Sequence, residues 1–92
     1  MAIKLTAQEK IQNIISQIVH LIEDGNFDEI EGKGLIASLG ASIEKLNQGK
    51  IGAAADMLEA FVNTVEAEVK AGNLTPVVGL ELVKAALNVL MD

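Results

Sequence analysis

The side chains with the clearest chemical potential in this sequence are oxygen-rich residues that follow its first apolar stretch. Calcium prefers carboxylate and amide oxygens as ligands. Asp24, Asn26 and Asp28 occupy alternate positions, as the first three ligands of an EF-hand loop do. These three residues are therefore the calcium candidates of the chain. The whole acidic segment also includes Glu23, Glu29 and Glu31.

The sequence after Asp28 does not continue the EF-hand pattern. Glu29 stands where the loop needs a glycine for its sharp turn, and Leu35 stands where it needs a bidentate glutamate. A solvated acidic turn explains the same residues, because carboxylates near a helix N-terminus interact favourably with the helix dipole. We therefore expect no metal and no other cofactor, with calcium at the three candidates as the alternative.

No other group of residues forms a catalytic pattern. His20 is the only histidine, and no Ser, Cys or Asp stands at a spacing that makes it an obvious general base. Glu66 and Glu68 are two residues apart on a predicted helix, so their side chains diverge and cannot act as a pair. The Gly-Lys sequences at 32–34 and 49–50 lack the Ser or Thr of a phosphate loop. The sequence predicts a protein that is not an enzyme.

The composition restricts the partners. The net charge is −6, from 13 acidic residues and 7 lysines, with no arginine, tyrosine or tryptophan. Nucleic-acid binding relies on cations and on stacking aromatics, so neither nucleic acid nor an anionic membrane is expected as a partner. No apolar run approaches the 18 or so residues of a membrane span. A protein, either a neighbouring domain or a second copy, is a better match than a small molecule.

Four helices must position these side chains. Thr6 and Glu9 form a capping box, an isoleucine stripe follows, and Gly25 ends a helix predicted over 7–24. The same kinds of signal predict helices over 31–47, 51–71 and 76–91, the last beginning with Pro76 after Thr75. Residues 1–6 are expected to be a leader segment and residues 7–91 a single domain.

The two halves of the chain repeat one physical pattern. Residues 12–39 can be laid over 59–86, a shift of 47, with apolar positions and turn residues coinciding. Short connections make consecutive helices antiparallel neighbours. The sequence thus predicts an all-α fold, a four-helix bundle with up-and-down connections built from two pseudo-repeated helical hairpins.

Several positions in these helices have specific expectations. Phe27 and Ile30 should fold down onto the end of the core, and Ile51 and Leu87 should face inward. Gly34 and Gly40 should mark close helix contacts, because glycine inside a helix otherwise costs about 1 kcal/mol relative to alanine. The fourth helix is apolar nearly all round, so another molecule is expected to cover part of it. The residues expected to bind a partner there are Val77, Leu80 and Met91.

The arrangement of residues 14–90 resembles the FIMAH domain family. The resemblance rests on Gly25-Asn26, Ile43-Glu44-Lys45-Leu46, Gly49-Lys50, Ala60-Phe61-Val62 and Gly72-Asn73-Leu74-Thr75, with Leu35, Leu39, Ala54, Leu58, Val65, Leu82, Val83 and Ala86 between and after them. FIMAH domains are small helical modules near the C-termini of multidomain, mostly secreted bacterial proteins, including glycosidases and other hydrolases. The resemblance implies a non-catalytic accessory role with no established ligand.

We therefore expect a helical accessory module that acts in interaction or spacing within a larger protein, which is extracellular or at the cell surface. The residues alone leave a cytoplasmic location open. The alternative is a free-standing bundle that self-associates or binds a partner helix through its apolar fourth helix. An enzyme would require a substrate-sized pocket that gathers His20 with several carboxylates.

Overall fold

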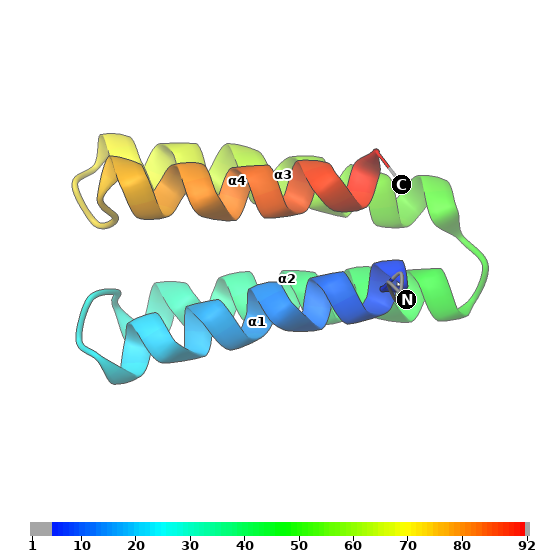
Figure 1. Cartoon of the computed structure of the whole chain (residues 1–92), viewed down its shortest axis with the longest axis horizontal. Helices are drawn as coiled ribbons and strands as arrows, with labels where there is room; N and C mark the ends of the chain where they lie inside the picture. The colour runs from blue at the N-terminus through cyan, green and yellow to red at the C-terminus, as the bar shows by residue number, and fades with distance from the viewer. Residues whose placement is uncertain (1–4, 92) are drawn as a thin grey trace, which may run out of the picture.

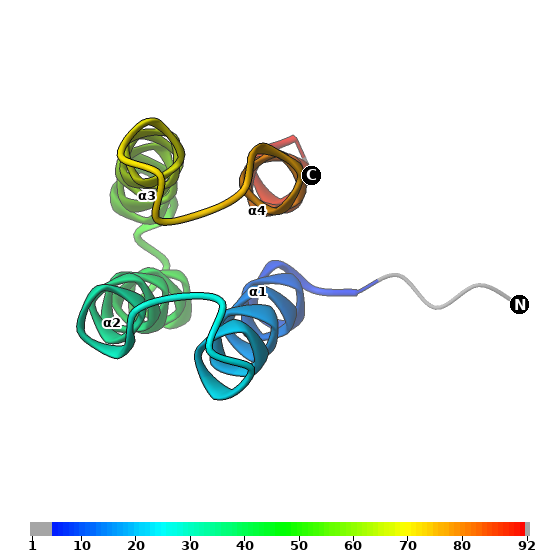
Figure 2. The same cartoon turned by 90° about the vertical axis from the view of Figure 1, so that its left-hand side faces the viewer.

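The computed structural model describes residues 5–91 and contains four helices. They are α1 (Ala7–Glu23), α2 (Glu29–Asn47), α3 (Ile51–Lys70) and α4 (Pro76–Leu90), and the described residues include no strand. Consecutive helices run in opposite directions, so the chain forms the hairpins α1–α2 and α3–α4 (Figure 1). Seen along the helices, α1 lies beside α2 and α4, and α3 lies beside the same two helices (Figure 2). The predicted all-α four-helix arrangement is confirmed.

Side-chain caps determine where three of the helices begin. The Thr6 hydroxyl accepts a hydrogen bond from the Glu9 amide (3.1 Å), and the Glu9 carboxylate accepts one from the Thr6 amide (2.9 Å). Asp28 and Thr75 cap α2 and α4 through their side-chain oxygens. Because Asp28 is the cap, α2 begins at Glu29, two residues before the predicted start. Of the predicted leader 1–6, the segment 1–4 lies outside the described residues.

The helices α1 and α3 end in the same way. Gly25 and Gly72 have φ angles of 78° and 84°, in the left-handed region that glycine adopts readily. The Gly25 amide donates to the Ile22 carbonyl (3.1 Å), and the Asn26 amide donates to the Leu21 carbonyl (2.9 Å). Gly72 and Asn73 make the corresponding pair of bonds to Val69 and Glu68. Both helices therefore stop in a Schellman motif.

The core is mainly aliphatic and includes Phe27 and Phe61, and its buried positions in the second hairpin lie 47 residues after those in the first. Burying each large aliphatic side chain stabilises the folded state by roughly 1.5–3 kcal/mol. Buried side chains of both hairpins belong to one cluster, so the core forms between the hairpins and neither has a complete core of its own. The corresponding buried pairs are Ile11 and Leu58, Ile14 and Phe61, Ile18 and Val65, Phe27 and Leu74, Leu35 and Leu82, and Leu39 and Ala86.

Three apolar residues predicted to face inward are exposed instead. Ile30 and Ile51 are 82% and 70% exposed, because each lies in the first two residues of its helix and points away from the core. Leu87 is 43% exposed, whereas Val89 is buried. The buried face of α4 follows Leu82, Ala86 and Val89, and Leu87 lies about 100° away from Ala86 around the helix.

The prediction that Gly34 and Gly40 mark close helix contacts is wrong. A methyl group placed on either residue would meet no other atom within 4 Å. The close approaches are at Gly32 and Gly79, which are buried. A methyl group on Gly32 would lie 2.7 Å from Ile22 Cγ1, and one on Gly79 would overlap a Val69 methyl group. In each hairpin, glycine therefore allows the two helices to pack closely near the connecting turn.

Candidate functional site

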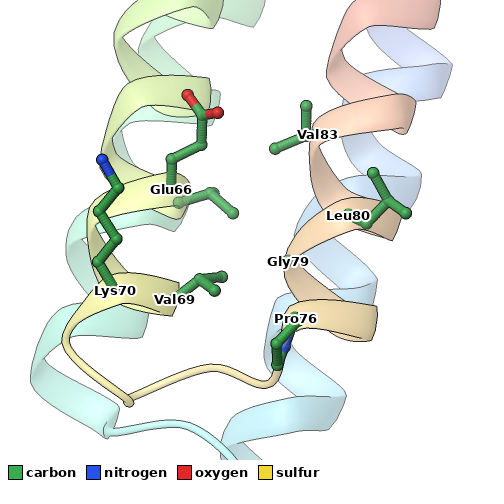
Figure 3. A pocket seen from close by; sticks show the side chains of 8 residues that line it. Glu66, Val69, Lys70, Pro76, Gly79, Leu80 and Val83 are labelled. Atoms are coloured by element: carbon green, nitrogen blue, oxygen red, sulfur yellow. The ribbon is translucent and has the colours of Figure 1, made fainter.

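The candidate site is an apolar groove between α3 and α4, near the turn that joins them. It has a volume of about 280 Å³. Figure 3 shows Val69 and Val83 pointing into the space between the helices, with Leu80 further out on α4. This surface, called the α3–α4 groove below, is lined by Val65, Glu66, Val69 and Lys70 of α3 and by Pro76, Gly79, Leu80 and Val83 of α4.

Two residues of α4 line the groove near the turn. Gly79 has no side chain, and a Val69 methyl group fills the space that its Cβ would take, so α4 lies close to α3 at this point and the Gly79 backbone forms part of the lining. Pro76 is the first residue of α4, where its missing N–H breaks no helical hydrogen bond. Its ring adds apolar surface at the end of the groove near the turn. Both residues line the groove near the turn without a long side chain of their own.

The edge of the groove carries one charge of each sign. Glu66 and Lys70 are four residues apart on α3, on the same side of the helix. Neither forms an ion pair with another residue in 5–91. Leu80 lies on the side of α4 turned away from α3 (Figure 3) and is 54% exposed. An occupant of the groove would meet an apolar floor, a protruding leucine and two charges of opposite sign.

The three residues predicted to bind a partner are all at the surface. Val77 is 68% and Met91 is 86% exposed, and together with Leu80 they lie on the outward side of α4. Leu80 alone of the three lines the groove. The sequence prediction missed the contribution of α3, namely Glu66, Val69 and Lys70. The contact between Val69 and Gly79 brings α3 into the groove. The repeat contains a signal for this contact, because Val69 and Gly79 lie 47 residues after Ile22 and Gly32.

The first hairpin has charged side chains where the second has the apolar edge of the groove. Glu29 and Lys33 are 47 residues before Pro76 and Leu80. The Lys33 ammonium lies 2.9 Å from the Glu29 carboxylate in an exposed ion pair. The open apolar edge is thus a property of the second hairpin.

The calcium candidates lie at the turn between α1 and α2. One Asp28 carboxylate oxygen accepts hydrogen bonds from the amides of Ile30 (3.0 Å) and Glu31 (3.1 Å). Asp24 is the C-terminal cap residue of α1, and Asn26 closes the Schellman motif through its backbone. Within residues 5–91 the structure has no group of three or more His, Asp or Glu side chains placed to hold a metal ion. Calcium binding at this turn stays an untested alternative.

A polar cluster joins the two hairpins at the same end of the bundle. The Asn73 side-chain amide donates to the carboxylates of Glu68 (3.1 Å) and Glu31 (3.2 Å). A hydrogen bond with the Glu68 carboxyl raises the pKa of Glu31, and partial desolvation and repulsion from Glu68 and Asp28 raise it further. Glu31 and Glu68 therefore act as a carboxyl pair across α2 and α3.

His20 lies in a shallow groove of about 230 Å³ between α1 and α4, which Asp24 and Glu81 also line. Its side chain is 75% exposed, and its Nδ1 is 3.7 Å from a Glu23 carboxylate oxygen. Among the described residues no hydrogen bond orients the ring, and no Ser, Thr or Cys lines this groove. The arrangement lacks the positioned partner that a general base requires.

Comparison with known proteins identifies one family. The model of the FIMAH domain family matches residues 11–91, which confirms the resemblance seen in residues 14–90. No curated protein and no solved structure gives a significant match. None of the helices in residues 5–91 has the length and hydropathy of a membrane span.

Proposed function

The chain belongs to the FIMAH domain family, a family of small accessory domains, and from that premise we propose that it is a non-catalytic interaction module of a larger protein. The single observation that carries the proposal is the α3–α4 groove. An apolar floor beside an exposed leucine loses unfavourable contact with water when a partner covers it. The corresponding surface of the first hairpin carries the Glu29–Lys33 ion pair.

A non-catalytic role follows from the chemistry of the polar residues. His20 is exposed and has no positioned acid or nucleophile. The carboxyl pair Glu31 and Glu68 is engaged by the Asn73 amide and lies on the surface that joins the hairpins. The contacts of His20, Glu31 and Glu68 thus require no catalytic role for these side chains.

The larger protein is proposed to be extracellular or at the cell surface. The support is the family, whose members are mostly parts of secreted multidomain proteins. Surface labelling of intact cells, with detection through an antibody against this domain, tests the location. Detection only after cell lysis would contradict it.

The interaction surface can be tested by site-specific cross-linking in the protein as its host produces it. A photo-reactive phenylalanine analogue replaces Leu80 in one variant and Lys33 in the other. The two positions correspond in the two hairpins and are both exposed, so Lys33 is a matched control. We expect a discrete adduct from position 80 and none from position 33. Equal adducts from both positions, or none from either, would contradict the proposal.

The exposed apolar residues of α4 favour a second candidate, a bundle that associates with its own copies. Val77, Leu80, Leu87 and Met91 lie within an arc of about 80° on the helix, at 3.6 residues per turn. Such a stripe is typical of a helix that packs against another molecule.

A further inference from the structure

We propose that the outward side of α4 binds one helix of a different protein, and that this helix carries an acidic residue among its apolar contacts. The inference rests on the proposed function, because it names the chemistry of the partner that covers Leu80. The contact uses five residues on α4 and at its C-terminal cap, called the α4 seam below. They are Val77, Leu80, Lys84, Leu87 and Met91.

The spacing of the α4 seam indicates that its partner is a helix. Its members stand alternately three and four residues apart over two heptads, which is the a and d pattern of a coiled coil. Side chains at this spacing leave holes that accept the side chains of a second helix. The four apolar members are exposed, from 43% at Leu87 to 86% at Met91. The buried face at Leu82 and Ala86 lies on the opposite side of α4, so the core does not require this spacing.

The first hairpin does not repeat the α4 seam. The residues 47 positions earlier on α2 are Ile30, Lys33, Ala37, Gly40 and Glu44. Ile30 is the one large apolar residue among them, and Lys33 forms an ion pair with Glu29. The hairpins share their core positions, so a stripe that occurs in one of them does not follow from the repeated packing. This difference favours a role in binding for the seam.

Lys84, at the centre of the seam, determines the charge that the partner needs. It is exposed and forms no ion pair within residues 5–91. A helix that covers the seam takes part of this side chain out of water, and an unpaired charge in an apolar contact is costly. An aspartate or glutamate facing Lys84 offsets that cost. A single charged residue at such a position also fixes the partner and the register.

The same lysine disfavours a second copy of this chain as the occupant. The seam extends seven residues to either side of Lys84, so two fully overlapping copies bring their Lys84 side chains together in either orientation. Like charges that meet in an interface weaken binding. The net charge of −6 and the exposed Glu81 beside the seam favour basic residues at the edges of the partner. The partner is therefore a basic amphipathic helix with one carboxylate in its apolar stripe.

A synthetic peptide of about 15 residues, the length of two heptads, tests the inference. This glutamate peptide has leucine at its seam positions, glutamate at the central one, and lysine and alanine elsewhere. In the lysine peptide, lysine replaces that glutamate. Fluorescence anisotropy of each labelled peptide with the 92-residue chain gives the dissociation constants. We expect the glutamate peptide to bind at least about tenfold more tightly, although general charge attraction to an acidic chain favours the lysine peptide.

Exchange of the charge on α4 tests the pairing itself. Lys84→Glu should reverse the preference, so that the lysine peptide becomes the tighter ligand. Lys33→Glu is the matched control, because it changes the net charge equally at an exposed residue of the first hairpin. This variant should keep the preference for the glutamate peptide. Leu80→Glu should weaken both peptides at least about tenfold, and circular dichroism verifies that each variant keeps the helical spectrum of the wild type.

Three results would overturn the inference. One is no binding of the glutamate peptide up to about 1 mM, the weak limit of specific association. Another is a preference that is absent in the wild type or unchanged in Lys84→Glu. The third is a wild-type dimer in sedimentation equilibrium that Leu80→Glu dissociates, because a second copy then occupies the seam. The proposed function still stands if position 80 cross-links to a different protein, and absence of that cross-link as well would overturn both.

Discussion

The two hairpins bury corresponding side chains but present different surfaces. Ile18, Ile22 and Gly32 in the first hairpin have the same places as Val65, Val69 and Gly79 in the second. At the edge, however, Glu29 and Lys33 correspond to Pro76 and Leu80. The shared positions are those that packing requires. The difference lies at positions that packing leaves free, and there the second hairpin can acquire a binding surface without loss of stability.

The largest expected effects come from the shared core. Ile18→Asp in the first hairpin and Leu58→Asp in the second should each abolish cooperative unfolding, because both side chains are at most 2% exposed and the new carboxylate would have no partner. Thermal unfolding followed by circular dichroism measures this. A cooperative transition near the wild-type temperature in one variant alone would show that the hairpins do not share a core.

The two buried glycines should respond differently to a methyl group. Gly79→Ala should destabilise the fold by about 1–3 kcal/mol, since the methyl group would overlap the stiff, β-branched Val69 side chain. Gly32→Ala should cost less, because its nearest neighbour is the movable end of Ile22. Urea unfolding gives both values. Equal costs would contradict the difference in packing.

Gly34→Ala and Gly40→Ala are the controls for these two variants. Both glycines lie inside α2 with open space around them. Alanine should therefore stabilise the fold by up to about 1 kcal/mol through its helix propensity. Destabilisation would reveal a close contact at these positions.

The carboxyl pair between the hairpins should make stability depend on pH. The pKa of Glu31 in the folded chain is raised above its ordinary value of 4.5, so the folded state binds this proton more tightly than the unfolded state. Its favourable contribution is complete below pH 4.5 and is lost as the pH rises through the raised pKa. Glu31→Gln should remove this dependence and raise the melting temperature at pH 7 relative to the wild type.

Glu9→Gln is the opposite case and serves as the control. Hydrogen bonds from the Thr6 backbone and side chain lower the pKa of Glu9, so its contribution is present above pH 4.5 and is lost as the pH falls through the lowered pKa. Melting temperatures between pH 3 and pH 7, about one unit apart, separate the two effects. A Glu31→Gln variant with the pH profile of the wild type would contradict the role of the pair.

The smallest effect is expected at the acidic turn. Calcium should leave the amide shifts of residues 23–31 unchanged, because Asp28 already accepts two backbone hydrogen bonds. The turn at 71–75 has no acidic residue and provides an internal reference. Shifts confined to the first turn would establish a calcium site at Asp24, Asn26 and Asp28.

Most of the fold could be predicted because helix signals are local. Thr6 with Glu9, Gly25, and Thr75 with Pro76 place helix ends to within one residue of the structure. The start of α2 was less clear, because five acidic residues near it offered more than one cap. The apolar character of Ile30 and the helical spacing of Ile51 with Leu58 predict that both face the core. Their places at the first residues of a helix, where the stripe has not yet begun, leave them exposed.

The candidate site could be predicted only in part. The exposed apolar side chains of α4 follow from its composition, and Val77, Leu80 and Met91 are at the surface as expected. The groove depends on Val69 and Gly79 meeting across two helices, which is a contact of tertiary structure. Gly34 and Gly40 were equally plausible contacts from the sequence, because spacing along one helix does not show which side its neighbour occupies.

The central claim is that only the second hairpin carries an interaction surface, and amide chemical shifts of the isotope-labelled chain on addition of the glutamate peptide test it most directly. The two hairpins are compared within one molecule, so differences in sample or folding cannot affect the result. The account predicts shift changes in residues 77–91 and none in the corresponding residues 30–44. Changes in both segments, or in 30–44 alone, would contradict it.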